Sequence, residues 1–249
     1  MTKISPTDAY EIVAGQVSSP LILLCDHASN RVPAEYGDLG IAPEQFARHI
    51  AYDIGARDLT LGLAALLGAS AVLSCFSRLL IDPNRGLDDP TLIMRISDGA
   101  AVPGNRDVDE VERQRRITRF HAPYHQAVAT TIHAVQDRGQ VPLIVSIHSF
   151  TPVWRGWPRP WHVGILWDRD ERIAQAMIRG FAAQHGLVVG DNEPYHGALE
   201  GDTLNTHGTR PGLPHALIEV RQDLIATKTG VDEWVERVAQ VIEPIMNDG

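Results

Sequence analysis

LILLCDHASN, residues 21–30, decides how the chain is interpreted. Its first half is an unbroken apolar run, which is typical of a strand buried on both faces of a sheet. Its second half is polar and predicts a loop directly after that strand. Similar apolar runs predict further strands at residues 71–76, 141–147, 162–167, 187–189 and 215–220.

Helical periodicity separates most of these runs. We expect helices over residues 43–67, 109–138, 170–185 and 230–246, the second kinked or interrupted at Pro123. Strands that alternate with helices predict an α/β fold with a mainly parallel or mixed central sheet and helices on both faces. Residues 87–103 and 191–210 are expected to be long polar loops, and such loops often contribute to a site.

Composition limits the function classes. With 249 residues, 44% hydrophobic and 21% charged, the chain is expected to form a single domain over residues 1–249. A net charge of −9 argues against a general nucleic-acid binder. We expect no membrane span and no signal peptide, because no apolar run is long enough. The two cysteines form no CxxC motif, and a cytoplasmic location is therefore expected.

Polar residues that follow apolar strands are the candidates for chemistry. His27 and His148 each come at the end of a predicted strand, where ligands bind in open α/β sheets. Two histidines with one carboxylate would form an open zinc-type site. The third ligand is either Asp53 or Asn30, and a carboxylate is the stronger ligand. Asp26 could instead orient an imidazole.

Other residues extend this candidate site. Glu219 interrupts an apolar strand, so it is either a general base for a metal-activated water or a structural partner of Arg221 or Arg210. The pair Asn84–Arg85 suits a substrate carboxylate, although a solvated loop pair is common. The remaining candidate substrate contacts are Arg78 and Ser149. His121 and His125 have i, i+4 spacing without a glutamate between them, which favours helix packing or an orienting role over metal binding.

Seven short stretches together resemble the N-formylglutamate amidohydrolase family from about Leu21 to Leu224. They are CDHASNRVP (25–33), HIAYDIGA (49–56), FSRLLIDPNR (76–85), APYHQA (122–127), SIHSF (146–150), NTHG (205–208) and ALIEVRQDL (216–224). Each is weak alone, but their order and spacing are specific. The resemblance implies the phosphorylase/hydrolase-like fold of the related zinc carboxypeptidases and aspartoacylases.

The resemblance also implies residue roles. In those relatives a glutamate follows the first zinc histidine by three residues, but here Asn30 stands at that place. Asp53 matches an aspartate typical of the amidohydrolases and is the preferred third ligand beside His27 and His148. Glu219 resembles the catalytic glutamate, and the pair Asn84–Arg85 resembles the one that grips a substrate carboxylate.

The implied reaction is hydrolysis of an N-acyl amino acid that has a free carboxylate. Glu219 would deprotonate water at Zn²⁺ or another divalent ion and return the proton to the leaving amine. N-formyl-L-glutamate, an intermediate of histidine degradation, would yield formate and L-glutamate. The alternatives are a carboxypeptidase- or aspartoacylase-like deacylase, or a non-catalytic binding protein that has lost the metal. Asn30 is the best support for the last of these.

Overall fold

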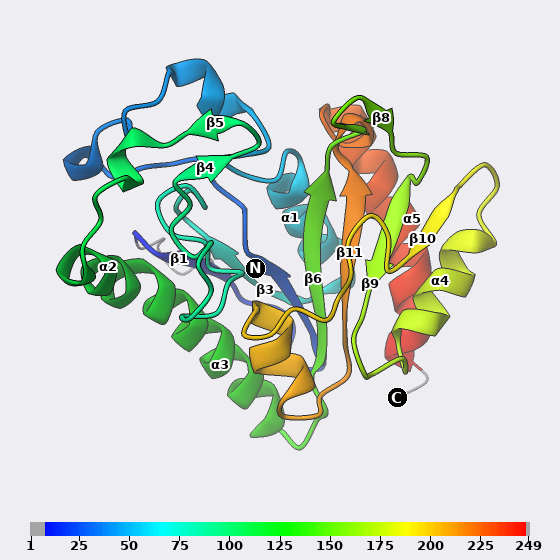
Figure 1. The fold of residues 1–249 in the computed structure, drawn as a ribbon. Coiled ribbons are helices and arrows are strands. Elements are labelled where there is room, and N and C mark those ends of the chain that lie inside the picture. The colour runs from blue at the N-terminus through cyan, green and yellow to red at the C-terminus, as the bar shows by residue number, and fades with distance from the viewer. Residues whose placement is uncertain (1–7, 248–249) are drawn as a thin grey trace.

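The computed structural model describes residues 8–247 and contains one seven-stranded sheet (Figure 1). Its strands are β1 (Tyr10–Val13), β2 (Leu21–Cys25), β3 (Ser70–Ser74), β6 (Leu143–Phe150), β9 (Val163–Leu166), β10 (Val189–Asp191) and β11 (His215–Arg221). They lie in the order β1-β3-β2-β6-β11-β9-β10. The pairs β1–β3 and β11–β9 are antiparallel and the other neighbours are parallel, so the sheet is mixed.

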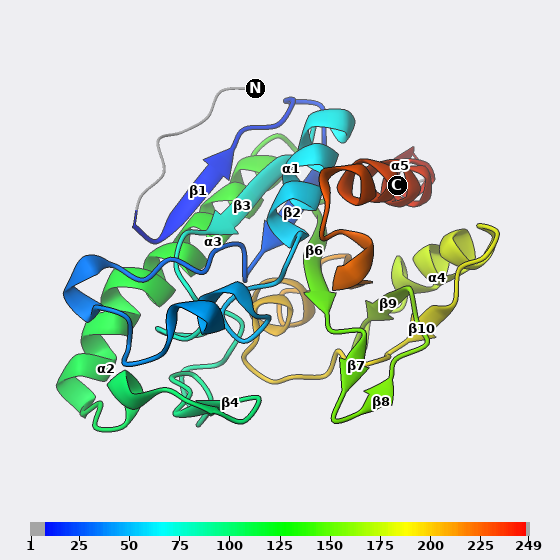
Figure 2. The ribbon, with the colours of Figure 1, turned by 90° about the horizontal axis from the view of Figure 1, so that it is seen from above.

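Helices cover both faces of this sheet. On one face lie α1 (Ala56–Leu67), α4 (Ala174–Ala182) and α5 (Lys228–Asn247), and on the other lie α2 (Glu110–Arg116) and α3 (Ala122–Gln136) (Figure 2). Every residue of β2, β6 and β9 is buried, as expected for strands that are covered on both sides. The predicted α/β class is therefore confirmed.

The helix predicted over residues 43–67 is wrong in its first half. A 3-10 helix, η2, covers Pro43–Ala47, irregular chain follows, and α1 begins only at Ala56. Gly55 has a φ of 78°, a left-handed conformation that a right-handed helix cannot contain. A Cβ at this position would lie 2.2 Å from the Ile225 carbonyl oxygen, so close packing also requires glycine.

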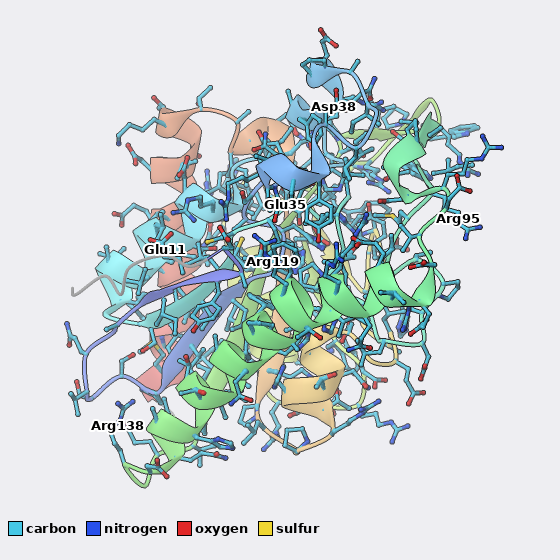
Figure 3. The ribbon with its side chains drawn as sticks, turned by 90° about the vertical axis from the view of Figure 1, so that its left-hand side faces the viewer. Glu11, Glu35, Asp38, Arg95, Arg119 and Arg138 are labelled. Carbon is cyan, nitrogen blue, oxygen red and sulfur yellow. The ribbon has the colours of Figure 1, made fainter. Side chains whose placement is uncertain are left out.

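The segment predicted as one helix over residues 109–138 is helical but not uniform. A π-helical turn, η4 (Ile117–His121), joins α2 to α3 just before Pro123. Proline has no amide hydrogen to donate back along the helix, so the regular hydrogen-bond pattern is interrupted here. Figure 3 shows the segment as one long helical stretch that passes Arg119 and runs toward Arg138.

Small elements occupy the polar loops. The two short hairpins are β4 (Ile96–Ser97) with β5 (Ala100–Ala101) and β7 (Val153–Trp154) with β8 (Trp157–Pro158). The remaining turns are the 3-10 helices η1 (Ala34–Tyr36), η3 (Pro103–Asn105) and η6 (Gln222–Leu224) and the π turn η5 (Asn205–Thr209). Within residues 8–247, no helix is long and apolar enough to span a membrane.

The parallel arrangement of β2, β6 and β11 decides where the polar residues gather. Parallel strands present their carboxyl ends at one edge of the sheet, and His27 lies two residues beyond the end of β2. His148 and Glu219 belong to the neighbouring strands β6 and β11, in which they are direct register partners. The sheet therefore brings all three side chains to the same edge.

Candidate metal centre and active site

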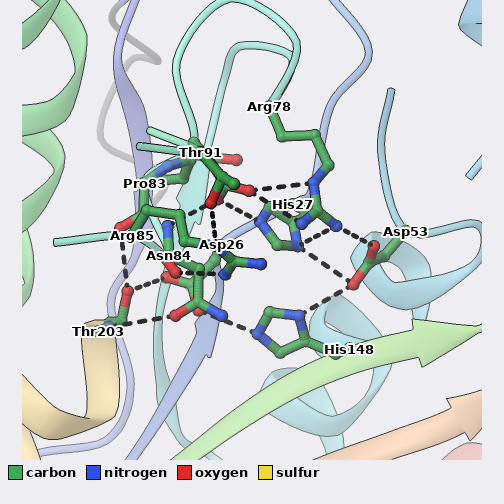
Figure 4. Close-up of polar contacts among 12 residues, drawn as sticks. Asp26, His27, Asp53, Arg78, Pro83, Asn84, Arg85, Thr91, His148 and Thr203 are labelled. Atoms are coloured by element: carbon green, nitrogen blue, oxygen red, sulfur yellow. Dashed lines mark hydrogen bonds and ion pairs between the residues drawn. The ribbon is translucent and has the colours of Figure 1, made fainter. Parts of the chain in front are cut away.

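His27, Asp53 and His148 converge at this edge of the sheet (Figure 4). One potential ligand atom from each lies within 4.8 Å of the other two, and all three residues are buried. The imidazole rings stand nearly perpendicular, at 83°, with centroids 5.0 Å apart. Two nitrogens and a carboxylate oxygen form the donor set of an open divalent-metal site.

The backbone places Asp53 beside the histidines although it lies far from them in sequence. Its amide nitrogen donates to the His27 carbonyl oxygen at 2.9 Å. The Ser149 amide nitrogen donates to Asp53 Oδ2 at 3.3 Å, and the Ser149 hydroxyl donates to the Ile54 carbonyl oxygen at 2.8 Å. The loop that ends at Gly55 is thus attached to both histidine-bearing strands.

A buried aspartate orients each imidazole. Asp82 Oδ1 lies 2.8 Å from His27 Nε2, and Asp26 Oδ2 lies 3.0 Å from His148 Nε2. Arg78 Nη1 lies 3.2 Å from His27 Nδ1, and because arginine only donates, this nitrogen must be an acceptor. His27 therefore carries its proton on Nε2 and accepts at Nδ1 from Arg78, and the same Nδ1 lies 3.4 Å from Asp53 Oδ2. Carboxylates placed in this way hold metal-binding histidines in the required tautomer.

Asp26 is the most heavily bonded of these carboxylates. It also accepts hydrogen bonds from Tyr124, Ser146 and Thr203 at 2.8, 3.1 and 2.7 Å. Burial alone would raise the pKa of Asp26, but the hydrogen bonds and the neighbouring imidazoles hold it below its usual range. Asp26 is therefore ionised and rigid, as expected of a group that orients His148.

The charge balance of the cluster suits a cation. Asp26, Asp53 and Asp82 are buried carboxylates with pKa values held below their usual range, because nearby imidazoles and Arg78 outweigh the effect of burial. The buried Oδ1 of Asp53 has no hydrogen-bond partner within the described chain, and Arg78 Nη1 lies 3.6 Å from it.

His148 responds to the same excess of negative charge. Burial would lower its pKa, but the flanking Asp26 and Asp53 carboxylates raise it well above the usual value. A divalent ion would take the place of that proton, because a ligating imidazole must be unprotonated. The residues present therefore fit a bound metal ion.

Asn30 lies away from this cluster. Its side-chain amide donates to the Phe46 carbonyl oxygen at 2.8 Å, and the residue is exposed. Of the two alternatives that the sequence left open, only Asp53 lies with the histidines.

Glu219 faces the cavity from β11 and is 6% exposed. Its Oε2 has no hydrogen-bond partner within the described chain. Burial raises the pKa of Glu219 to about 8, nearby Asp53 adds to the rise, and His148 opposes it. Neither arginine considered as its structural partner binds it, since Arg221 pairs with Asp223 and Arg210 with Glu200. A buried carboxyl with a free oxygen and a raised pKa is suited to proton transfer.

Asn84 and Arg85 line the same cavity from the turn after Pro83. Thr203 N donates to Asn84 Oδ1 at 3.1 Å, and the backbone nitrogen of Asn84 donates to Asp82 Oδ1 at 2.9 Å. Arg85 donates to the Asn84 carbonyl oxygen at 2.7 Å and to Thr91 Oγ1 at 3.1 Å. Both side chains therefore lie on the cavity wall, with the Arg85 guanidinium held against its own turn.

The cavity measures about 600 Å³ and joins these groups. Its polar lining consists of His27, Asp53, His148, Glu219, Arg78, Asn84 and Arg85. Trp154, Trp167 and Tyr195 add aromatic surface. Its size and mixed lining are those of a small-molecule site.

Sequence reasoning missed three contributors. Asp82 lies inside the quoted FSRLLIDPNR stretch, and a buried acid next to an apolar run could have signalled its role. Thr203 and Tyr195 lie in the loop predicted over residues 191–210, which carries no periodicity. Tyr195 also receives a hydrogen bond from Arg159 Nη1 at 3.1 Å, a contact between distant segments.

Comparison with known proteins identifies the family. The family model of N-formylglutamate amidohydrolase matches residues 19–226. The chain belongs to this family. It is therefore a member of a hydrolase family that acts on amides, as its sequence predicts.

Solved structures support the same fold. The gene product Atu2144 from Agrobacterium tumefaciens is 34% identical, with a TM-score of 0.88 over 95% of this chain and 96% of that one. N-formylglutamate amidohydrolase from Ralstonia eutropha is 20% identical, with a TM-score of 0.76 over 97% and 98% of the two chains. A bacteriophage poly-gamma-glutamate hydrolase shares the fold at 10% identity and a TM-score of 0.51, over 100% of this chain and 94% of that one. No curated protein matches.

Proposed function

We propose that the protein is a metal-dependent amidohydrolase that cleaves N-formyl-L-glutamate to formate and L-glutamate. The observation that carries the proposal is the convergence of His27, Asp53 and His148 beside Glu219, whose buried Oε2 has no partner. A binding module has no need for a buried, proton-accepting carboxyl beside a cation site. The family that the chain belongs to supports the amide as the bond that is cleaved.

Each residue has a proposed role in this reaction. His27, Asp53 and His148 would hold the ion, Zn²⁺ or another divalent metal, which when bound polarises the amide carbonyl and lowers the pKa of a water molecule. Glu219 takes a proton from the attacking water and delivers it to the leaving nitrogen. Its raised pKa suits this exchange, because a carboxyl that titrates near neutral pH both accepts and releases a proton readily.

Arginines bind and orient the substrate in this scheme. Asn84 and Arg85 hold a carboxylate of the amino-acid part, through the Asn84 amide and the Arg85 guanidinium. Arg78 is fixed by two hydrogen bonds to Asp82 Oδ2, of 3.2 and 2.9 Å, and its Nη1 faces His27 Nδ1 at 3.2 Å. With His27 Nδ1 occupied by the ion, this Nη1 would be released to donate to the substrate carbonyl. Ser149 lines the cavity, but its hydroxyl donates to Ile54, so we propose that it holds the Asp53 loop in place.

Metal analysis combined with a formate-release assay tests the proposal. The purified protein is expected to carry about one equivalent of a divalent metal and to lose turnover of N-formyl-L-glutamate on chelation. Turnover should return when Zn²⁺ is added back. Metal-free protein with undiminished turnover would reject the proposed role of the cluster.

A substitution separates substrate binding from chemistry. Arg85→Ala should raise KM for N-formyl-L-glutamate more than it lowers kcat, because the guanidinium binds a part of the substrate that does not react. Arg138→Ala, an exposed arginine beyond α3, is the matched control and should leave both constants unchanged. An unchanged KM in Arg85→Ala would dismiss the proposed carboxylate site.

A further inference from the structure

Three histidines outside the metal cluster stack behind the Asn84–Arg85 pair. His121 ends the π turn η4, His125 lies in α3, and His207 lies in the π turn η5. The ring centroids of His121 and His125 are 4.3 Å apart, and those of His125 and His207 are 5.1 Å apart. We call these three residues the histidine relay.

The histidine relay binds the backbone on both sides of Asn84. His125 Nε2 lies 2.9 Å from the Pro83 carbonyl oxygen, and His121 Nε2 lies 3.0 Å from the Arg85 carbonyl oxygen. A carbonyl oxygen only accepts, so both Nε2 atoms must carry a hydrogen. Two imidazoles from one helical segment therefore fix the peptide group before Asn84 and the one after Arg85.

These two hydrogen bonds decide the tautomers of the rest of the cluster. With its hydrogen on Nε2, a neutral His125 has an acceptor at Nδ1, which lies 2.9 Å from His207 Nε2. His207 must therefore donate from Nε2. If His125 took a second proton, two N–H groups would face each other and the contact would break. The contact between His207 and His125 therefore runs in one direction and requires a neutral His125.

The surroundings keep the rings neutral. Burial lowers the pKa of His121, His125 and His207 to about 4 in each case. The imidazoles lower one another further, because His125 opposes a charge on His121 and His207 opposes one on His125. The facing acids, Asp26 for all three rings and Asp82 for His121, act in the opposite direction without offsetting burial.

Metal binding does not explain the histidine relay. Among residues 8–247, the ligand atoms of three such side chains converge only at His27, Asp53 and His148. Both nitrogens of His125 are already engaged, one with a carbonyl oxygen and one with another imidazole. The hydrogen bonds of His121 and His125 to the Pro83–Arg85 backbone therefore indicate what the three histidines do.

The geometry points to a positioning role in substrate recognition. We propose that the histidine relay holds the Asn84–Arg85 turn in the conformation that binds the substrate carboxylate, an inference that rests on the proposed function. Thr203 and Asp82 also hold this turn, through Asn84 Oδ1 and the backbone nitrogen of Asn84, and the Thr203 hydroxyl lies 3.3 Å from the same Pro83 carbonyl oxygen. The relay therefore controls affinity for the carboxylate and leaves the proton transfer by Glu219 untouched.

A pair of substitutions at His125 tests this role. Gln places a side-chain amide nitrogen near the position of the imidazole Nε2, so His125→Gln should still donate to Pro83. His125→Phe fills similar space without a donor. We expect His125→Phe to raise KM for N-formyl-L-glutamate about tenfold, the cost of about one hydrogen bond, with kcat within about twofold of the unmodified protein. His125→Gln should keep KM within about twofold.

The outer member and a control complete the series. His207→Phe should raise KM by less than His125→Phe, because it removes only the group that orients His125. His133→Phe lies in the same helix with an exposed ring and should change neither constant. An unchanged KM in folded His125→Phe would overturn the proposal. The proposal would also be overturned if His125→Phe and His125→Gln lost kcat and melting temperature to the same extent, because His125 would then have a structural role alone.

Binding of L-glutamate, measured by calorimetry on the same proteins, separates the two proposals. If the unmodified protein binds L-glutamate but hydrolyses no amide, the proposed function fails while the relay is still tested. His125→Phe should then weaken binding about tenfold relative to His125→Gln. Equal affinities in these two variants, or no binding by the unmodified protein, would reject the relay as a positioning device.

Discussion

Glu219→Gln is the sharpest test of the proposed chemistry. The substitution keeps the shape of a buried side chain, which is 6% exposed, and removes its ability to accept a proton. General-base catalysis contributes about 10²–10⁴-fold to a rate, so kcat should fall by about that factor. The metal content should not change, because the ion is assigned to His27, Asp53 and His148.

The raised pKa of Glu219 fixes two further outcomes. With a pKa of about 8 in the metal-free protein, about nine in ten of these carboxyls are protonated at pH 7. Gln therefore replaces a mostly neutral group, and the melting temperature of the metal-free protein should hardly change. A bound cation favours the carboxylate, so the pH at which kcat reaches half its plateau should lie below 8.

The measurement is formate release against pH, with metal analysis of each preparation. Glu236→Gln, an exposed glutamate of α5, is the matched control and should behave as the unmodified protein does. The acidic limb of the pH profile, over which kcat rises as Glu219 loses its proton, should disappear in Glu219→Gln. If Glu219→Gln keeps its metal and retains kcat within about tenfold, Glu219 is not the base and the mechanism is refuted.

Three further perturbations test the supporting structure. Asp26→Asn removes the negative charge to which His148 and three hydroxyl groups are hydrogen-bonded. It should lower the free energy of unfolding by about 3 kcal/mol, measured by urea denaturation, and weaken metal retention, measured by metal analysis. Gly55→Ala should destabilise the fold by more than about 1 kcal/mol, since φ is 78° and the new Cβ would lie 2.2 Å from the Ile225 carbonyl oxygen; a melting temperature equal to that of the unmodified protein would contradict this packing. The three histidines of the relay have pKa values of about 4 in the folded protein, against 6.5 for an ordinary histidine. Between these pH values the unfolded chain binds more protons than the folded one. The free energy of unfolding should therefore be highest above pH 6.5 and fall as the pH drops toward 4. Urea unfolding midpoints at pH 7, 5.5 and 4.5 measure this loss of stability, which should be smaller in His125→Gln. A midpoint that does not change with pH would exclude a contribution of the histidine relay to the pH dependence of stability.

Strand positions were readily predicted because burial on both faces leaves a strong local signal. Residues 21–25 and 215–220 read as apolar runs and lie in β2 and β11 of the structure. β1 was not predicted, because its YEIV segment alternates in burial at the sheet edge and has no continuous apolar run. The helix predicted over residues 43–67 begins too early, because helical periodicity does not reveal that Gly55 adopts a left-handed conformation.

The sequence by itself determined the class of fold and the residue types at the carboxyl edge of the sheet. His27, His148 and Glu219 were found because each directly follows or interrupts an apolar strand, a local feature. Strand alternation predicted that they would share an edge, and the parallel register of β6 and β11 confirms it.

Only the tertiary structure decided how those residues are supported. Asp53 joins the histidines through a backbone hydrogen bond between positions 26 residues apart, and Asp26 meets Thr203 across 177 residues. Contacts of this range leave no pattern in a single sequence, because they depend on how separate loops pack against the same strands. The tautomer of His27 and the orientation of the turn at Asn84 follow from such contacts, so they could be read only from the folded chain.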